Sequence, residues 1–101
     1  MKINIGNRTI TSVDFSNAET AWRIEDAISV LEHLRSKNKI VLGGDILTEK
    51  MEHNYDNWYY NVQPSRNFTF NVESSIRLAI KYISNYIGTN GNAFYVIFII
   101  E

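Results

Sequence analysis

Apolar residues recur at helical spacing in the first third of the chain. Six of them fall on one face at about 100° per residue: Ala21, Ile24, Ala27, Ile28, Leu31 and Leu34. Just before them, Ser16-Asn17-Ala18-Glu19 has the pattern of a capping box, in which the Ser16 hydroxyl accepts from the Glu19 N–H. The pattern therefore predicts a helix from Ser16 to about Ser36.

A second stretch has the same period. Its apolar face is the cleanest in the chain: Val72, Ile76, Ala79, Ile80, Ile83, Tyr86 and Ile87. Asn71 is placed to cap its N-terminus, and Gly88 is placed to end it. We expect a helix from Val72 to Ile87. The connection before it should tuck Phe68 and Phe70 onto the core.

Two segments between the helices alternate as strands do. The first runs from Ile40 to Thr48 and contains Gly43-Gly44, which favours a bulge or a close approach of another backbone. A tight hairpin at the two glycines is the alternative, but each arm would be only about three residues long. The second runs from Asn57 to Gln63, with a polar loop over Glu49–Asp56 between them.

The final segment, Ala93 to Ile100, is apolar on both faces, which is typical of a central strand. Met1 to Ile5 is a short strand candidate before a turn at Gly6-Asn7, and Thr9 to Phe15 is irregular or an edge strand. The elements predict an α+β fold in which two amphipathic helices pack on a small sheet of three to four strands, in the order (β)αββαβ. If both helices cover one face, the N-terminal segment, a homodimer or a partner must cover the other.

Composition supports one small globular domain over residues 1–101. The 101 residues are 45% apolar and 21% charged, which are globular values. The chain has no cysteine, which excludes disulfides and thiolate metal sites. No apolar run approaches ~18 residues, and the start has no signal-peptide pattern. We expect a cytoplasmic protein that does not enter a membrane.

Charge is unevenly distributed. The net charge is −1, and no basic stripe suggests nucleic-acid binding. Residues 41–60 carry four acidic groups against the single Lys50: Asp45, Glu49, Glu52 and Asp56. A solvated loop is the default interpretation. An acidic binding surface is the sharper one, because aromatic residues flank the acids.

Three aromatic residues need separate interpretations. Tyr59 shares a strand face with Asn57 and Asn61 and is the best contact candidate. Trp58 faces the other way, and we favour a place in the core over an interface role. Trp22 lies off the first helix's apolar face; we expect it to be covered, with an exposed interface anchor as the alternative.

No catalytic or metal constellation is recognisable. His33 and His53 have no ligand spacing, and the calcium-loop pattern fails around Lys50. There is no nucleophile motif, and no helix follows Gly43-Gly44 to form a phosphate loop. We therefore expect no catalytic, cofactor-binding or metal residues.

The motifs VLGGDI at residues 41–46 and YDNWYYN at residues 55–61 carry a family resemblance. With a following helix that bears Tyr82 and Tyr86 and an apolar closing strand, they resemble the bacterial immunity proteins of polymorphic toxin systems, and specifically the immunity protein 40 family. The likeness runs from about Ser16 to the end. Its most telling parts are Gly43-Gly44-Asp45 and Asp56-Asn57-Trp58-Tyr59.

The resemblance implies a non-enzymatic α+β protein that binds and neutralises one cognate toxin domain. The residues we expect to meet that partner are Asp45, Glu49, Glu52, Asp56 and Tyr59. Gly43, Gly44 and Trp58 match the family motif, and the sequence leaves open whether they serve the fold or the site. Two alternatives also stay open: a small ligand-binding domain or enzyme with a pocket around Asp45 and Trp58, and a structural homodimer module.

Overall fold

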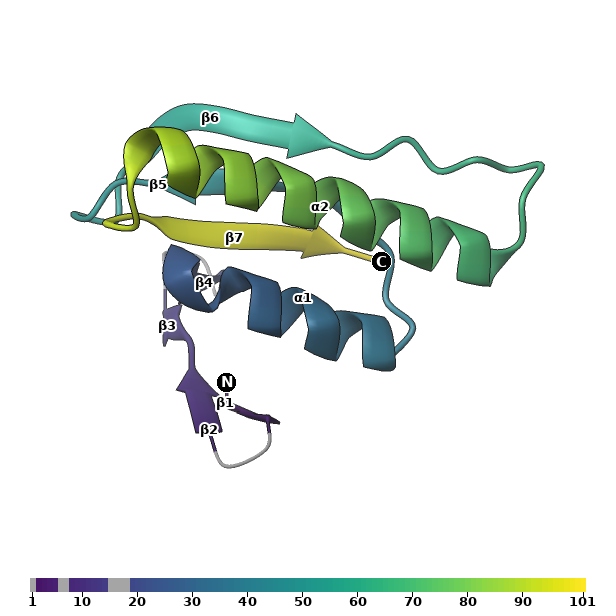
Figure 1. The fold of residues 1–101 in the computed structure, drawn as a ribbon, viewed down its shortest axis with the longest axis horizontal. Coiled ribbons are helices and arrows are strands. Elements are labelled where there is room, and N and C mark those ends of the chain that lie inside the picture. Colours follow the sequence, from purple (N-terminus) through teal and green to yellow (C-terminus); the bar gives the residue numbers. More distant parts are fainter. Residues whose placement is uncertain (1, 6–7, 15–18) are drawn as a thin grey trace.

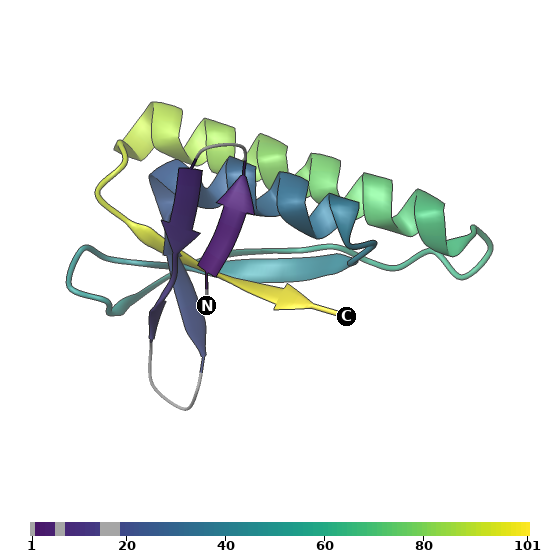
Figure 2. The ribbon, with the colours of Figure 1, turned by 90° about the horizontal axis from the view of Figure 1, so that it is seen from below.

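Two helices lie on one face of a five-stranded sheet, and a separate two-stranded hairpin precedes them (Figures 1 and 2). The computed structural model describes residues 2–5, 8–14 and 19–101. Along the chain the elements are β1 (Lys2–Ile5), β2 (Arg8–Thr11), β3 (Val13–Asp14), β4 (Thr20–Arg23), a 3₁₀ turn (Ile24–Asp26), α1 (Ala27–Ser36), β5 (Val41–Leu47), β6 (His53–Tyr59), α2 (Phe68–Asn90) and β7 (Tyr95–Ile100).

The mixed α+β class is confirmed, but the predicted sheet of three to four strands is too small. The described residues form seven strands in two sheets, β1-β2 and β3-β4-β7-β5-β6. All neighbouring strands are antiparallel. The additional strands come from residues 8–23, for which the sequence predicted irregular structure or an edge strand, followed by a helix.

The predicted start of the first helix is wrong. Residues Thr20–Arg23 form β4, in which Trp22 pairs with Val96 of β7. Ala21 and Trp22 are both buried, and they belong to cores on opposite sides of the sheet. That alternation belongs to a strand and not to a helix. The capping-box residues Ser16, Asn17 and Ala18 lie outside the described residues, as do Gly6 and Asn7.

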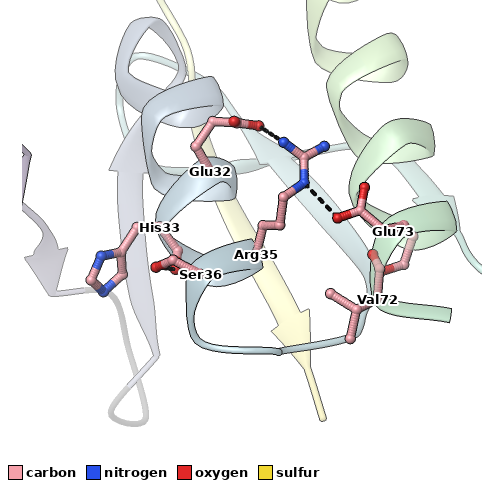
Figure 3. A network of polar contacts seen from close by, with 7 residues as sticks. Glu32, His33, Arg35, Ser36, Val72 and Glu73 are labelled. Carbon is pink, nitrogen blue, oxygen red and sulfur yellow. Dashed lines mark hydrogen bonds and ion pairs between the residues drawn. The ribbon is translucent and has the colours of Figure 1, made fainter. Parts of the chain in front are cut away.

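Helix α1 begins only at Ala27 and turns a slightly different face inward. Val30 is buried, whereas Ile28, which was expected on the core face, is exposed. The helix is tied to α2 through Arg35, whose side chain lies between Glu32 of its own helix and Glu73 of α2 (Figure 3). The Arg35 Nε to Glu73 Oε1 distance is 3.1 Å.

Strand β7 is central, as its two apolar faces predicted. It pairs with β4 on one edge and with β5 on the other. Val96 and Phe98 pack in the main core beneath the helices, while Ile97 joins a small cluster on the opposite face. Trp22 also lies in the main core, so the expectation that it is covered is confirmed.

The Gly43-Gly44 pair lies within one continuous strand. The register against β7 shifts between Val41 and Gly43, which confirms the bulge and makes the hairpin alternative wrong. A Cβ on Gly44 would collide with the Trp58 ring and lie 2.7 Å from the Ile97 carbonyl oxygen. Glycine is thus needed because neighbouring groups occupy the space of a side chain.

The bulge also needs a hydrogen bond from outside the sheet. The Val41 N–H donates to the buried Ser75 Oγ of α2 at 2.9 Å. Ser75 in turn donates to the Val72 carbonyl oxygen. The buried Ser75 hydroxyl therefore supplies the acceptor for a backbone N–H that has no partner in the sheet at this irregular register.

The second predicted strand is displaced. β6 covers His53–Tyr59, so half of the expected Glu49–Asp56 loop is strand. The actual turn is short: the Thr48 N–H donates to the Glu52 carbonyl oxygen at 2.7 Å, and Met51 adopts φ of 63°. After Tyr59 the chain leaves the sheet, which corrects the predicted end at Gln63.

The reason for this early departure is Asn71, which was expected to be the cap of α2. Asn67 is the cap and accepts from the Phe70 N–H at 2.7 Å. Asn71 lies inside the helix at 2% exposure. Its Oδ1 accepts from the Tyr60 hydroxyl at 2.7 Å and from the Gln63 N–H at 2.8 Å, so it fastens the connection to the helix.

Helix α2 is longer than predicted at both ends. It passes through Gly88 and ends at Asn90, and Gly91 caps it with a φ of 84° that suits glycine. Phe68 is 54% exposed in its first turn and is not tucked onto the core. Phe70 is half-buried, with the Arg66 guanidinium 3.8 Å from its ring centre.

The face of the five-stranded sheet opposite the helices, here called the outer face, is only thinly covered. Its buried residues are Ala21, Leu47 and Ile97, with Met51 and Tyr95 packed against them. The N-terminal hairpin does not cover it, because Ile3 and Ile10 belong to the main core with α1. Neither helix in the described part of the chain has the length and apolar content to cross a membrane.

Candidate partner-binding surface

Cross-strand rows organise the outer face. One row consists of Tyr59, Gly43 and Ile99, which pair across β6, β5 and β7. The next consists of Asn57, Asp45 and Ile97 in the same strands. Paired residues point to the same face of a sheet.

Asp45 and Tyr59 are thus neighbours on the outer face, on adjacent strands and adjacent rows. Tyr59 is 71% exposed, and Asp45 is half-buried in the middle of the sheet. Gly43 has no side chain between Tyr59 and Ile99, and it is itself buried. This part of the surface offers an aromatic ring, a carboxylate and an exposed isoleucine side by side.

Glu49 and Glu52 lie in the short turn between β5 and β6, and both are exposed. Together with Asp45 and Asp56 they form the acidic group predicted from the sequence. None of the four makes an ion pair with a lysine or arginine among the described residues. These carboxylates are therefore not engaged in ion pairs with lysine or arginine within this part of the chain.

Asp56 points away from the other three acids. Its Oδ2 accepts a hydrogen bond from the Tyr86 hydroxyl of α2 at 2.7 Å, and the same hydroxyl accepts from Asn54 Nδ2 at 2.9 Å. Burial raises the pKa of Tyr86 to about 12, with a contribution from the Asp56 hydrogen bond, while the Asn54 bond acts in the opposite direction. Burial and the Asp56 charge also raise the pKa of Tyr82. Asp56 therefore lies on the helix side of β6, apart from Tyr59.

Trp58 is part of the core, as the sequence favoured. It is 6% exposed, stacks on Tyr82 at 4.8 Å between ring centres, and meets Phe98 edge-on at 6.0 Å. Gly44 pairs with it across the ladder. Asp45, one residue further, turns to the outer face, so the sheet itself separates Asp45 from Trp58.

Two cavities lie elsewhere. One of about 370 Å³ is apolar and lies between β4, α1 and the end of β7, with Trp22, Leu34, Phe98 and Ile100 among its lining residues. The other, of about 190 Å³, lies beside the β5–β6 turn and is lined by Arg23, Glu49 and residues 92–95. Neither is lined by Asp45 or Trp58, and no metal-binding group of three or more His, Cys, Asp or Glu residues occurs in the described segments.

The sequence missed one prominent residue, Tyr55. It is 88% exposed and has a φ of 68°. It lies where the β5–β6 register shifts between Asp45 and Leu47, in a segment expected to be loop. The available signal was an aromatic residue placed between polar neighbours, Asn54 and Asp56.

The arrangement is suited to binding a protein. Exposed Tyr59 and the carboxylate of Asp45 lie on the outer face, with Glu49 and Glu52 in the adjoining turn, and aromatic residues are enriched at protein interfaces. Acidic groups on such a face favour a partner of opposite charge.

Comparison with known proteins identifies the family. The sequence model described as immunity protein 40 matches residues 9–100, from β2 to the last residue of β7. Searches of curated proteins and of solved structures gave no significant match. The matched region includes both glycine and aromatic motifs, the acidic turn and every strand of the five-stranded sheet. The chain belongs to the immunity protein 40 family.

Proposed function

We propose that this protein neutralises one cognate bacterial toxin domain by forming a stoichiometric complex with it in the cytoplasm. The interface is the outer face of β5 and β6 with the turn between them. Its residues are Asp45, Glu49, Glu52 and Tyr59, and Asp56 adds charge from the helix side. Family membership supports the role of inhibitor.

One observation carries the choice of surface: the four acidic residues of β5, β6 and their turn make no ion pair with a lysine or arginine in the described part of the chain. Four of the other seven acidic residues do have such partners: Glu25, Asp26, Glu32 and Glu73. A carboxylate left unpaired on a surface is available to a basic partner. Exposed Tyr59 supplies apolar contact area beside it.

Separation of Asp45 from Trp58 by the sheet weighs against a pocket that uses both residues. An inhibitor needs only affinity, and a surface with an exposed aromatic ring and carboxylates can provide it. The motif glycines and Trp58 already pack within the fold, so a partner should bind without rearranging them.

The test is co-expression with the toxin C-terminal domain encoded beside this chain's gene. Cells that carry both should grow, and cells that carry the toxin domain alone should not. The purified pair should elute as a one-to-one complex, with light scattering giving its mass. Loss of rescue or absence of the complex would refute the proposed function.

The surface is tested separately by a quadruple variant that combines Asp45→Asn, Glu49→Gln, Glu52→Gln and Tyr59→Ala. This variant should fold and fail to rescue growth. A variant that rescues fully, with a complex as stable as the wild type's, would show that the toxin binds another face.

A further inference from the structure

Tyr55 adopts a backbone conformation that its residue type disfavours. Its φ is 68°, and a positive φ is rare for a bulky residue. Such strain is normally offset by packing, yet this side chain is 88% exposed. The described part of the fold therefore gains little from having tyrosine at this position.

The residues on either side of Tyr55 are held firmly. Asn57 pairs with Asp45 and His53 pairs with Leu47, so β6 has more residues than β5 in this interval and bulges. Asn54 and Asp56 both bind the Tyr86 hydroxyl of α2, at 2.9 and 2.7 Å.

A further bond closes the bulge. The Asp56 N–H donates to Asn54 Oδ1 at 3.1 Å, so the two flanking residues are bound to each other as well as to α2. The backbone that carries Tyr55 is thus fixed while its ring stands in solvent. Bulges in edge strands commonly re-aim a side chain in this way.

We propose that Tyr55 is a preorganised anchor for the toxin domain and that its ring receives a guanidinium group of that partner. This inference rests on the proposed function. The carboxylates of β5, β6 and their turn have no lysine or arginine partner in the described part of the chain, so they favour a basic partner. An arginine side chain of that partner would stack favourably on an exposed tyrosine ring. A backbone fixed in advance lowers the entropy that binding must cost.

The probe is the purified toxin C-terminal domain encoded beside this chain's gene, with binding measured by calorimetry. Tyr55→Ala should raise the dissociation constant by about 30-fold or more, which is the effect expected of a hot-spot residue. Tyr55→Phe, which keeps the ring face, should bind within a few-fold of the wild type. Tyr55→Leu keeps an apolar side chain without the aromatic ring, and its affinity for the toxin domain should be about tenfold lower than that of the wild type.

Tyr55→Gly separates binding from folding. Glycine accepts a positive φ without strain, so the unfolding midpoint should equal or exceed that of the wild type while binding is lost. A much lower midpoint would mean that the tyrosine packs within the fold, which would overturn the proposal. Tyr55→Ala binding within threefold of the wild type would also overturn it, and Tyr55→Leu binding like the wild type would overturn the guanidinium contact.

Tyr86 is a positioning residue in this scheme. Tyr86→Phe removes both hydroxyl contacts and should weaken binding several-fold. It should have no further effect in the Tyr55→Ala background, and additive effects would exclude action through Tyr55. If wild-type protein forms no complex with the domain, the proposed function fails; if it does and Tyr55→Ala binds equally well, only this inference fails.

Discussion

Gly44 has no space for a side chain. A Cβ there would collide with the Trp58 ring and approach the Ile97 carbonyl oxygen to 2.7 Å. We expect Gly44→Ala to lower the free energy of unfolding by about 3 kcal/mol, as overpacking of a core does. Urea unfolding measures this change.

Gly88 provides the matched control. It lies within α2, and an added Cβ would meet nothing within 4 Å. Gly88→Ala should therefore raise the free energy of unfolding by up to about 1 kcal/mol through helix propensity. Equal effects of the two substitutions would contradict the close approach at Gly44.

Tyr86 predicts a stability change at high pH. Its pKa rises from the ordinary value of 10.0 to about 12 in the folded protein, first through burial and then through the bond to Asp56. Folding thus favours the neutral form of Tyr86. The stabilisation that Tyr86 adds to the free energy of unfolding is therefore complete below pH 10 and is lost as the pH rises from 10 to 12.

Comparison with Tyr86→Phe isolates this group from other titrations. The variant should be less stable than the wild type at neutral pH, because Asp56 and Asn54 lose their shared partner. The difference in unfolding free energy should narrow from pH 10 to pH 12. A difference that stays constant across this range would refute the assignment.

Among the elements, α2 depends on two asparagines in different ways. Asn67 caps the exposed N-terminus with one bond to the Phe70 N–H. Asn71 is buried and binds Tyr60 and both backbone groups of Gln63. Asn67→Ala should lower the free energy of unfolding by about 1 kcal/mol. Asn71→Ala should cost about 2–4 kcal/mol, because it leaves several buried groups unsatisfied.

Thermal or urea unfolding of the two variants gives the comparison. Asn71→Ala should also release the connection at residues 60–63, which amide hydrogen exchange would detect as faster exchange at Gln63. Equal costs for the two substitutions would mean that Asn71 acts only as part of the helix.

The sequence predicted the existence of most helices and strands correctly, but it was less accurate about the residues at which they begin and end. The apolar period located both helices and the doubly apolar β7. The same period predicted a helix at Thr20–Arg23, because Ala21 fits a helical face together with Ile24. In the structure these residues pair with β7 and form a strand. The pattern placed the start of α2 at Asn71 because a buried asparagine and a capping asparagine look alike until the connection packs against one of them. A local pattern cannot reveal a partner that is distant in sequence.

For the candidate surface, the direction in which a side chain faces was predictable only in the regular part of β6. Alternation there correctly separated Tyr59 from Trp58. It could not show that Asp56 turns to Tyr86, because the bulge at residues 54–56 breaks the period of two. Tyr55 was missed for the same reason, because no alternating pattern assigns this bulge residue to either face of β6.

Over the whole molecule, acidic charge is concentrated in β5, β6 and the turn between them. The net charge is −1, yet β5, β6 and their turn hold four acidic residues against Lys50 and no arginine. We expect the variant Asp45→Asn, Glu49→Gln, Glu52→Gln to associate with its toxin domain about tenfold more slowly at low salt, because steering is lost. Stopped-flow mixing measures the rate.

The control removes three acids elsewhere: Asp14→Asn, Glu19→Gln, Glu25→Gln. It changes the net charge equally and should leave the association rate near that of the wild type. At about 0.5 M salt, where charges are screened within a few ångströms, all three proteins should associate at similar rates. A control as slow as the triple variant would mean that net charge, and not this surface, governs the encounter.

The place of β7 in the sheet has a consequence for synthesis. It is the last strand along the chain, yet it lies between β4 and β5, which therefore cannot complete the sheet until it arrives. While the ribosome is still making residues 95–100, β5 has one unpaired edge and the main core lacks Val96 and Phe98. Folding of the sheet must follow translation of this segment, and the unfinished chain exposes strand edges to its neighbours until then. A cell that relies on this protein gains a folded molecule only after the ribosome has passed residue 100.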